Sequence, residues 1–169
     1  MRAVLAALML APAAPVAAGD FRLELPVDCV LNESCYIQRY VDHDPGAGVR
    51  DFRCGDRSGD GHKGTDIALH TLADLRRDVK VSAAAPGVVA GSRDGVPDRL
   101  YEPAHADEID GIECGNGVVL QHENGWETQY CHLRQGSIRV RPGQKVAAGE
   151  TLGTVGLSGK TQFPHLELV

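Results

Sequence analysis

Short apolar runs interrupted by glycine and proline constrain this chain more than any other feature of its sequence. The 169 residues include 20 glycines and 9 prolines, and apolar residues between these breaks tend to alternate with polar ones. A long helix needs an unbroken period of 3.6 residues, whereas alternation is typical of half-buried strands. The pattern therefore predicts a mostly β domain, built on a compact antiparallel sheet with long surface loops.

Two of these runs predict a hairpin. Residues 118–122 and 126–133 alternate in polarity, and Glu123-Asn124-Gly125 separates them. Asn-Gly between two such runs is a strong hairpin signal. A weak helix or turn is expected over 72–79, and a polar surface loop over 93–112. The other predicted strands cover residues 35–41, 65–69, 81–92 (with a turn at Pro86-Gly87), short pieces of 140–153, 152–155 and 165–169.

The first residues have the composition of an export signal. Met1 and Arg2 give a positively charged start, residues 3–16 are apolar or small, and Val16-Ala17-Ala18 precede Gly19. We expect a secretory signal peptide at 1–18, an irregular lead-in segment at 19–51 and one β domain at 52–169. The apolar run is shorter than the roughly 20 residues that cross a bilayer, so no stable membrane insertion is expected. The predicted location is periplasmic or extracellular.

Charge and cysteine content narrow the classes of function. There are 23 acidic and 17 basic residues, with a formal net charge of −6 and no Lys/Arg cluster, which argues against binding to nucleic acid or an anionic membrane. The five cysteines of an exported chain predict disulfides, with one thiol left over. We expect Cys114–Cys131, which flanks the hairpin, and as a second bridge either Cys29–Cys35 or Cys35–Cys54.

Two segments contain candidate metal ligands. His62 and Asp66 stand four residues apart after the glycine-rich stretch 56–64, and a turn at Gly64 would let their side chains converge. A histidine and a carboxylate are suitable zinc ligands. On the last strand, His165 and Glu167 share one face, while the intervening leucine faces the core. A buried carboxylate needs water, a cation or hydrogen-bond donors, so Glu167 needs such a partner.

The remaining histidines differ in their expected roles. His132 ends the second strand of the hairpin, in a context that suits a polar role. Cys131 beside it suggests a thiol protease, but neighbours on a strand point to opposite faces, which argues against that reading. His122 is expected on the hairpin surface, and no metal role is expected for it or for His43, His70 and His105. Trp126 is expected to be a core or hairpin residue.

Four motifs together resemble the lysostaphin-like (LytM-type) zinc endopeptidases over about residues 52–169. They are the glycine-rich lead into His-x-x-x-Asp, Tyr-x-His-Leu at 130–133, the Val/Gly run at 140–153, and Gly-x-Ser-Gly before Pro-His-Leu. The resemblance implies a sheet of the duplicated-hybrid-motif type, a Zn²⁺ cofactor and a peptidoglycan peptide as substrate. It implies a secreted metallopeptidase, which we expect to be a monomer.

The resemblance also implies roles for individual residues. His62 and Asp66 match the first two zinc ligands of the family. His132 matches a histidine that contacts the attacking water or the oxyanion, and His165 matches the first histidine of a His-x-His motif that helps to activate water. The second histidine of that motif is the third zinc ligand, and Glu167 occupies its position here.

The glutamate leaves two readings open. Glu167 can complete a His62/Asp66/Glu167 zinc site that keeps a fourth position open for water. Alternatively, the domain is a degenerate relative that binds peptidoglycan or regulates another hydrolase. A sugar- or lipoyl-type carrier domain, suggested by the glycine run at 140–153, lacks a lysine in a tight exposed hairpin.

Overall fold

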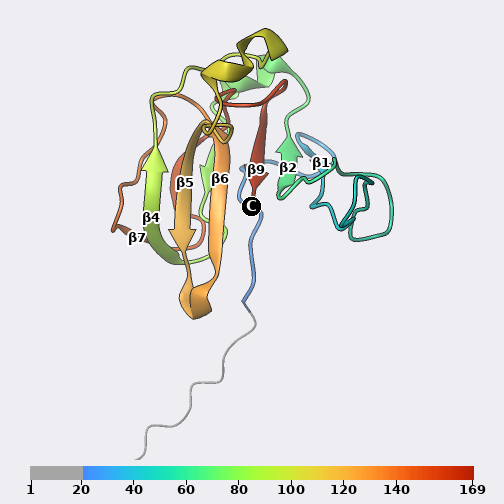
Figure 1. The fold of residues 1–169 in the computed structure, drawn as a ribbon. Helices are drawn as coiled ribbons and strands as arrows, with labels where there is room; N and C mark the ends of the chain where they lie inside the picture. The colour runs from blue at the N-terminus through green and yellow to red at the C-terminus, as the bar shows by residue number, and fades with distance from the viewer. Residues whose placement is uncertain (1–20) are drawn as a thin grey trace, which may run out of the picture.

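A computed structural model describes residues 21–169, and these residues form a mostly β domain (Figure 1). Seven strands make one sheet and two more form a small second sheet, and every pairing is antiparallel. The predicted fold class is therefore confirmed. The seven-stranded sheet contains, in spatial order, β1 (Tyr36–Arg39), β2 (Thr65–Ala68), β9 (His165–Leu168), β6 (Glu127–Leu133), β5 (Asn116–Gln121), β4 (Gly87–Arg93) and β7 (Lys145–Val146).

The second sheet pairs β3 (Lys80–Ser82) with β8 (Thr151–Thr154). Helical structure in the described residues consists of three short 3₁₀ segments, at Leu72–Arg77, Pro103–Glu108 and Glu123–Gly125. The first lies where a weak helix or turn was predicted, and the second lies within the predicted surface loop. No helix within residues 21–169 is long and apolar enough to cross a membrane.

One hydrophobic core joins the two sheets. Alternation along the strands sends every second side chain inward, as the sequence pattern predicted. On β9, Leu166 is fully buried and Leu168 packs partly buried against the core, which confirms the facing proposed for that strand. Side chains from both sheets meet in this core, including Val81, Val118, Leu120, Tyr130, Leu152 and Leu166.

The segment before residue 52 contributes to the same structure. Strand β1 pairs with β2 and so extends the large sheet, and Val27 forms a β-bridge with Val81. Cys35 is fully buried in the core. The division at residue 52 stays a prediction, but residues 21–51 pack as part of the fold. The predicted signal peptide lies outside the described residues.

Two disulfides form among the five cysteines. Cys114 is bonded to Cys131, as predicted, and Cys29 is bonded to Cys35. The alternative bridge between Cys35 and Cys54 is absent, and Cys54 is an exposed free cysteine.

Strands β5 and β6 form the predicted hairpin, which differs from the prediction in one detail. The two strands are joined by the 3₁₀ segment Glu123–Gly125, the three residues that separate the two runs in the sequence. The expectation that His122 lies on the hairpin surface was wrong, because this side chain is buried. It turns inward because both ring nitrogens find partners there: Nδ1 lies 2.8 Å from the Pro86 carbonyl oxygen and Nε2 lies 2.7 Å from Thr128 Oγ1. Trp126, by contrast, is largely exposed and stacks on Phe21.

The core placement can be tested on one hairpin strand and its neighbour. Leu120→Ala, which opens a cavity under the sheet, should lower the free energy of unfolding by about 2–5 kcal/mol. Val88→Ala, on the partly exposed face of β4, should cost less than about 1 kcal/mol. Urea denaturation with the disulfides intact measures both. Equal losses in the two variants would contradict this arrangement of the core.

Candidate metal centre

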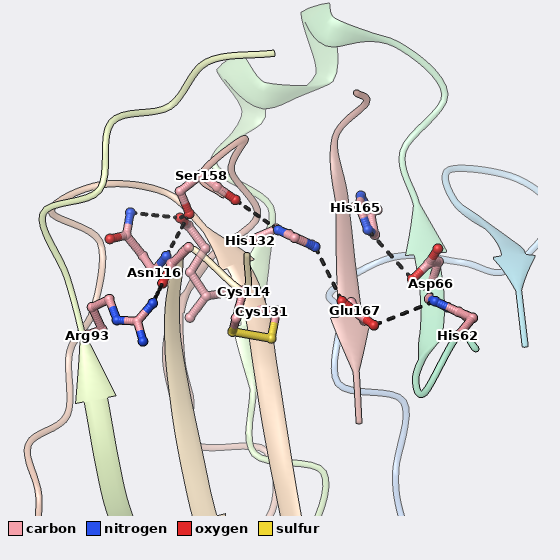
Figure 2. Close-up of a disulfide and its surroundings, with 12 residues drawn as sticks. His62, Asp66, Arg93, Cys114, Asn116, Cys131, His132, Ser158, His165 and Glu167 are labelled. Carbon is pink, nitrogen blue, oxygen red and sulfur yellow. Dashed lines mark hydrogen bonds and ion pairs between the residues drawn. A yellow bond between two sulfur atoms is a disulfide. The ribbon is translucent and has the colours of Figure 1, made fainter. Parts of the chain in front are cut away.

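The register of β2 against β9 brings the predicted site residues together. Asp66 pairs directly with Glu167, and Ala68 pairs with His165. On the other side of β9, Cys131 of β6 pairs with Glu167, and His132 follows at the end of that strand. Figure 2 shows Asp66, His62, Glu167, His132 and His165 converging from three neighbouring strands and the loop before β2.

Gly64 allows the loop before β2 to approach β9 closely. His62 lies in this loop, whose backbone is fixed by hydrogen bonds from His62 N to Gly59 O and from Asp42 N to His62 O. A Cβ atom on Gly64 would lie 2.6 Å from Glu167 Cγ and 3.0 Å from the Leu168 carbonyl oxygen. Only a glycine leaves room for the glutamate side chain here. The turn into a strand expected at Gly64 is therefore also the place where the loop contacts β9.

Three side chains are spaced to hold one cation. The ligand atoms of His62, Asp66 and Glu167 all lie within 4.8 Å of one another. His62 Nε2 is 3.2 Å from Asp66 Oδ1, and His62 Nδ1 is 3.7 Å from Glu167 Oε1. His62 Nε2 and Asp66 Oδ1 are both buried and have no hydrogen-bond partner within residues 21–169. Buried polar atoms of this kind are costly, and a cation would satisfy both.

The donor set suits zinc. One imidazole nitrogen and two carboxylates are ligands that zinc accepts, and three protein ligands leave a fourth position for water or substrate. The electrostatics are consistent with a cation. Contact with the Asp66 carboxylate raises the pKa of His62, and burial of the ring opposes this shift. The nearby His132 lowers the pKa of Glu167, so the carboxyl group favours its charged form.

The other two histidines point Nε2 at the same place. His165 Nδ1 lies 3.0 Å from the Phe163 carbonyl oxygen, and His132 Nδ1 lies 2.8 Å from the Ser158 carbonyl oxygen. Because a carbonyl can only accept, both Nδ1 atoms carry the proton. The Nε2 atoms then face the centre, at 3.6 Å from Asp66 Oδ1 for His165 and 3.4 Å from Glu167 Oε2 for His132. Burial lowers the pKa of His165 to about 4, so this ring is neutral near pH 7.

The centre lies in a groove with a volume of about 800 Å³. Tyr101, from the predicted polar surface loop over 93–112, lines the groove, and the Lys160 ammonium lies 5.8 Å from the centre of its ring. The wall also contains charged side chains of both signs, among them Arg39, Asp60, Lys63 and Glu113. The groove can therefore hold a polar, extended substrate beside the metal ligands.

Sequence reasoning missed one feature of this wall. Cys131 and His132 both line the groove, although alternation along a strand predicted opposite faces. The reason is an irregularity in β6: His132 has a left-handed backbone with φ of 63°. The thiol-protease reading fails for another reason, because Cys131 is bonded to Cys114. His122 and His70 lie away from the groove, where His70 stacks on Tyr36.

Comparison with known proteins identifies the family of this chain. The family model described as "Peptidase family M23" matches residues 60–169. The chain belongs to peptidase family M23. This confirms the resemblance drawn from the sequence motifs.

Curated relatives match a short part of the chain. The cell division protein DipM of Caulobacter vibrioides is 44% identical over 52 residues, which is 31% of this chain and 8% of DipM. The peptidoglycan DD-endopeptidase ShyA of Vibrio cholerae is 46% identical over 52 residues, which is 31% of this chain and 12% of ShyA. The matched segments therefore span only a small part of these longer relatives.

Solved structures share the fold across most of the chain. A mutant catalytic domain of the prophage-encoded M23 protein EnpA from Enterococcus faecalis has a TM-score of 0.53 at 22% identity, covering 82% of each chain. A chain of the SpoIIIAH and SpoIIQ complex has a TM-score of 0.57 at 19% identity, covering 86% of this chain and 89% of its own. At these identities the likeness shows the fold alone.

The close approach at Gly64 gives a test of the centre. Gly64→Ala should displace Glu167 and lower the affinity for zinc by about 10–100-fold, the usual cost of disturbing a group that supports metal ligands. Gly91→Ala on β4 is the control, since an added Cβ there meets nothing within 4 Å. Competition with a chromophoric chelator measures both affinities. Unchanged affinity in Gly64→Ala would exclude Glu167 from the metal centre.

Proposed function

We propose that this domain is a zinc metalloendopeptidase that hydrolyses peptide bonds of bacterial peptidoglycan. The observation that carries the proposal is the convergence of His62, Asp66 and Glu167, with two buried ligand atoms that have no hydrogen-bond partner in the described part of the chain. Beside this set, His132 and His165 turn Nε2 toward the same point. Membership of a peptidase family supports hydrolysis, and a relative named as a peptidoglycan DD-endopeptidase supports the substrate class.

The chain's own residues divide the work of the proposed reaction. A bound zinc ion supplies Lewis acidity toward a carbonyl and lowers the pKa of bound water. The neutral His165 ring offers Nε2 as the general base that takes a proton from water. His132 faces the same groove, and when its Nε2 carries a proton it can donate to the developing oxyanion or the leaving amine.

Glu167 changes the electrostatics of the centre without removing a ligand. A carboxylate in this position adds a second negative charge to that of Asp66. More charge donated to the metal makes bound water less acidic and the ion a weaker Lewis acid. We therefore infer a working site whose activity is limited by its third ligand.

A non-catalytic role is the alternative, and Glu167 is the observation that favours it. The resemblance places histidine at this position, so a centre with glutamate could fail to hold zinc while the groove still binds peptidoglycan or another hydrolase. For either role we propose a periplasmic or extracellular monomer. Two disulfides support export, because such bonds persist in oxidising compartments.

Metal analysis separates the two roles. The purified protein should hold about one zinc ion per chain, and Glu167→Ala should weaken binding by more than about 100-fold because it deletes a direct ligand. Glu127→Ala, an exposed glutamate on β6, is the matched control and should bind like the parent. Mass spectrometry of dialysed protein and chelator competition give the values. No zinc at saturating metal would eliminate the enzyme role.

Activity on isolated peptidoglycan tests the reaction itself. The parent should release new peptide ends, and His165→Ala should lower kcat by about 10²–10⁴-fold while zinc is retained, as expected for loss of a general base. His70→Ala, an exposed histidine outside the groove, should keep parental activity. Mass spectrometry of the released fragments identifies the bond. If Glu167→His is active and the parent is inert, the natural domain is the degenerate form.

A further inference from the structure

The disulfide between Cys114 and Cys131 lies in the wall of the proposed active-site groove (Figure 2). Cys131 directly precedes His132 on β6 and is buried, whereas Cys114 is half-buried at the approach to β5. The other disulfide, between Cys29 and Cys35, does not line the groove. One bridge therefore adjoins a proposed catalytic histidine, and the other provides an internal comparison.

A bulge in β6 sets the direction of His132. Asn116 pairs with Leu133 and Val118 pairs with Tyr130, so one residue of β5 opposes two residues of β6, Cys131 and His132. Bulges of this kind redirect a side chain and are frequent beside active sites. The backbone of His132 has a φ of 63°, which residues other than glycine seldom adopt. Such a conformation persists only where the surroundings hold it.

Contacts with Cys114 hold the bulge from the β5 side. The backbone N–H of His132 donates to the Cys114 carbonyl oxygen at 2.8 Å, and the disulfide joins Cys114 to the residue before His132. The opposing residue is Gly117, where a Cβ atom would lie 2.9 Å from Cys114 Sγ and 2.6 Å from the Tyr130 carbonyl oxygen. The bridge thus occupies the space that a side chain at position 117 would need.

A buried hydrogen-bond network fixes the far side of the imidazole. The Ser158 carbonyl oxygen accepts from His132 Nδ1, and Ser158 Oγ donates to the Leu133 carbonyl oxygen at 2.6 Å. The same Oγ accepts from the Asn116 backbone N–H at 2.8 Å. Ser158 and Asn116 are fully buried. The ring reaches the Ser158 carbonyl oxygen only from the backbone conformation of the bulge, so that conformation decides where Nε2 points.

We propose that the Cys114–Cys131 disulfide is a positioning element that holds His132 toward the metal centre. The inference rests on the proposed function, since it assigns the bridge a role in catalysis through His132. With the bridge formed, Nε2 lies 3.4 Å from Glu167 Oε2. Without it, one main-chain hydrogen bond links Cys114 to the bulge, and His132 samples other orientations. Small displacements of a catalytic group can cost about 10²-fold in rate.

Two paired variants test the role, both in a Cys54→Ser background that prevents disulfide exchange. One is Cys114→Ser/Cys131→Ser, and the matched control is Cys29→Ser/Cys35→Ser. For each, kcat and KM on peptidoglycan peptides, zinc content, melting temperature and the ¹⁵N signals of the His132 ring are measured. If the first variant does not fold, Cys114→Ala/Cys131→Val keeps the apolar packing and replaces it.

We expect kcat to fall only when the Cys114–Cys131 bridge is removed, and we expect zinc content and KM to stay near their parental values in that variant. Removing Cys114–Cys131 should lower kcat at least about tenfold, with zinc content unchanged and KM within about twofold, and should add a second tautomer signal for His132. The Cys29–Cys35 variant should lose thermal stability but keep kcat and a single Nδ1–H signal. Parental kcat and parental His132 signals without the Cys114–Cys131 bridge would overturn the proposal, and so would failure of both replacements to fold.

Failure of the proposed function gives a different result. If the parent hydrolyses no peptidoglycan, the peptidase role falls, and the His132 ring signals alone decide the inference. A change of these signals specific to the Cys114–Cys131 variant supports the positioning role. Identical signals in both paired variants overturn it.

Discussion

Two carboxylates face each other on paired strands and repel each other. The residues of the centre are arranged around this pair. Asp66 on β2 lies directly opposite Glu167 on β9, and Asp66 is only 2% exposed. Like charges in this position are destabilising. The register cannot slip by one residue, because Leu166 would then leave the core for the groove. Burial of a leucine therefore forces two anions together, and nearby positive charge or hydrogen-bond donors must compensate for them.

The groups that offset the charge of the two carboxylates lie on loops that come close to their neighbours, and a glycine makes each close approach possible. His62 contacts both carboxylates and lies on a loop that needs Gly64 to pass Glu167. Behind His132, the loops before β5 and β9 come equally close, since a Cβ atom on Gly159 would lie 2.2 Å from a backbone oxygen of the opposite loop. The glycines that exclude long helices thus also let loops meet around the centre. The same glycines therefore affect the secondary structure, the packing of the loops and the assembly of the centre.

Where the backbone is regular, side-chain direction followed from the sequence. His165 and Glu167 share a face because β9 is an unbroken strand with a buried leucine between them. The prediction failed at His132, where a bulge and a positive φ replace alternation, and no pattern in the sequence marks the extra residue. It also failed at His122, whose partner Pro86 lies 36 residues away. Local periodicity carries no information about such distant acceptors.

Glu167 lies between two histidines, and this position determines the effect of having glutamate where the resemblance places histidine. One oxygen approaches His62 Nδ1 and the other approaches His132 Nε2, so the carboxylate links the proposed metal ligands to a proposed catalytic histidine. A histidine there would offer one lone pair and no charge, whereas glutamate can ligate a cation and accept a hydrogen bond at once. Holding zinc is therefore compatible with this residue. If the centre holds zinc as proposed, the cost falls on reactivity, because His132 lies close to Glu167 and a bound metal would be more fully neutralised.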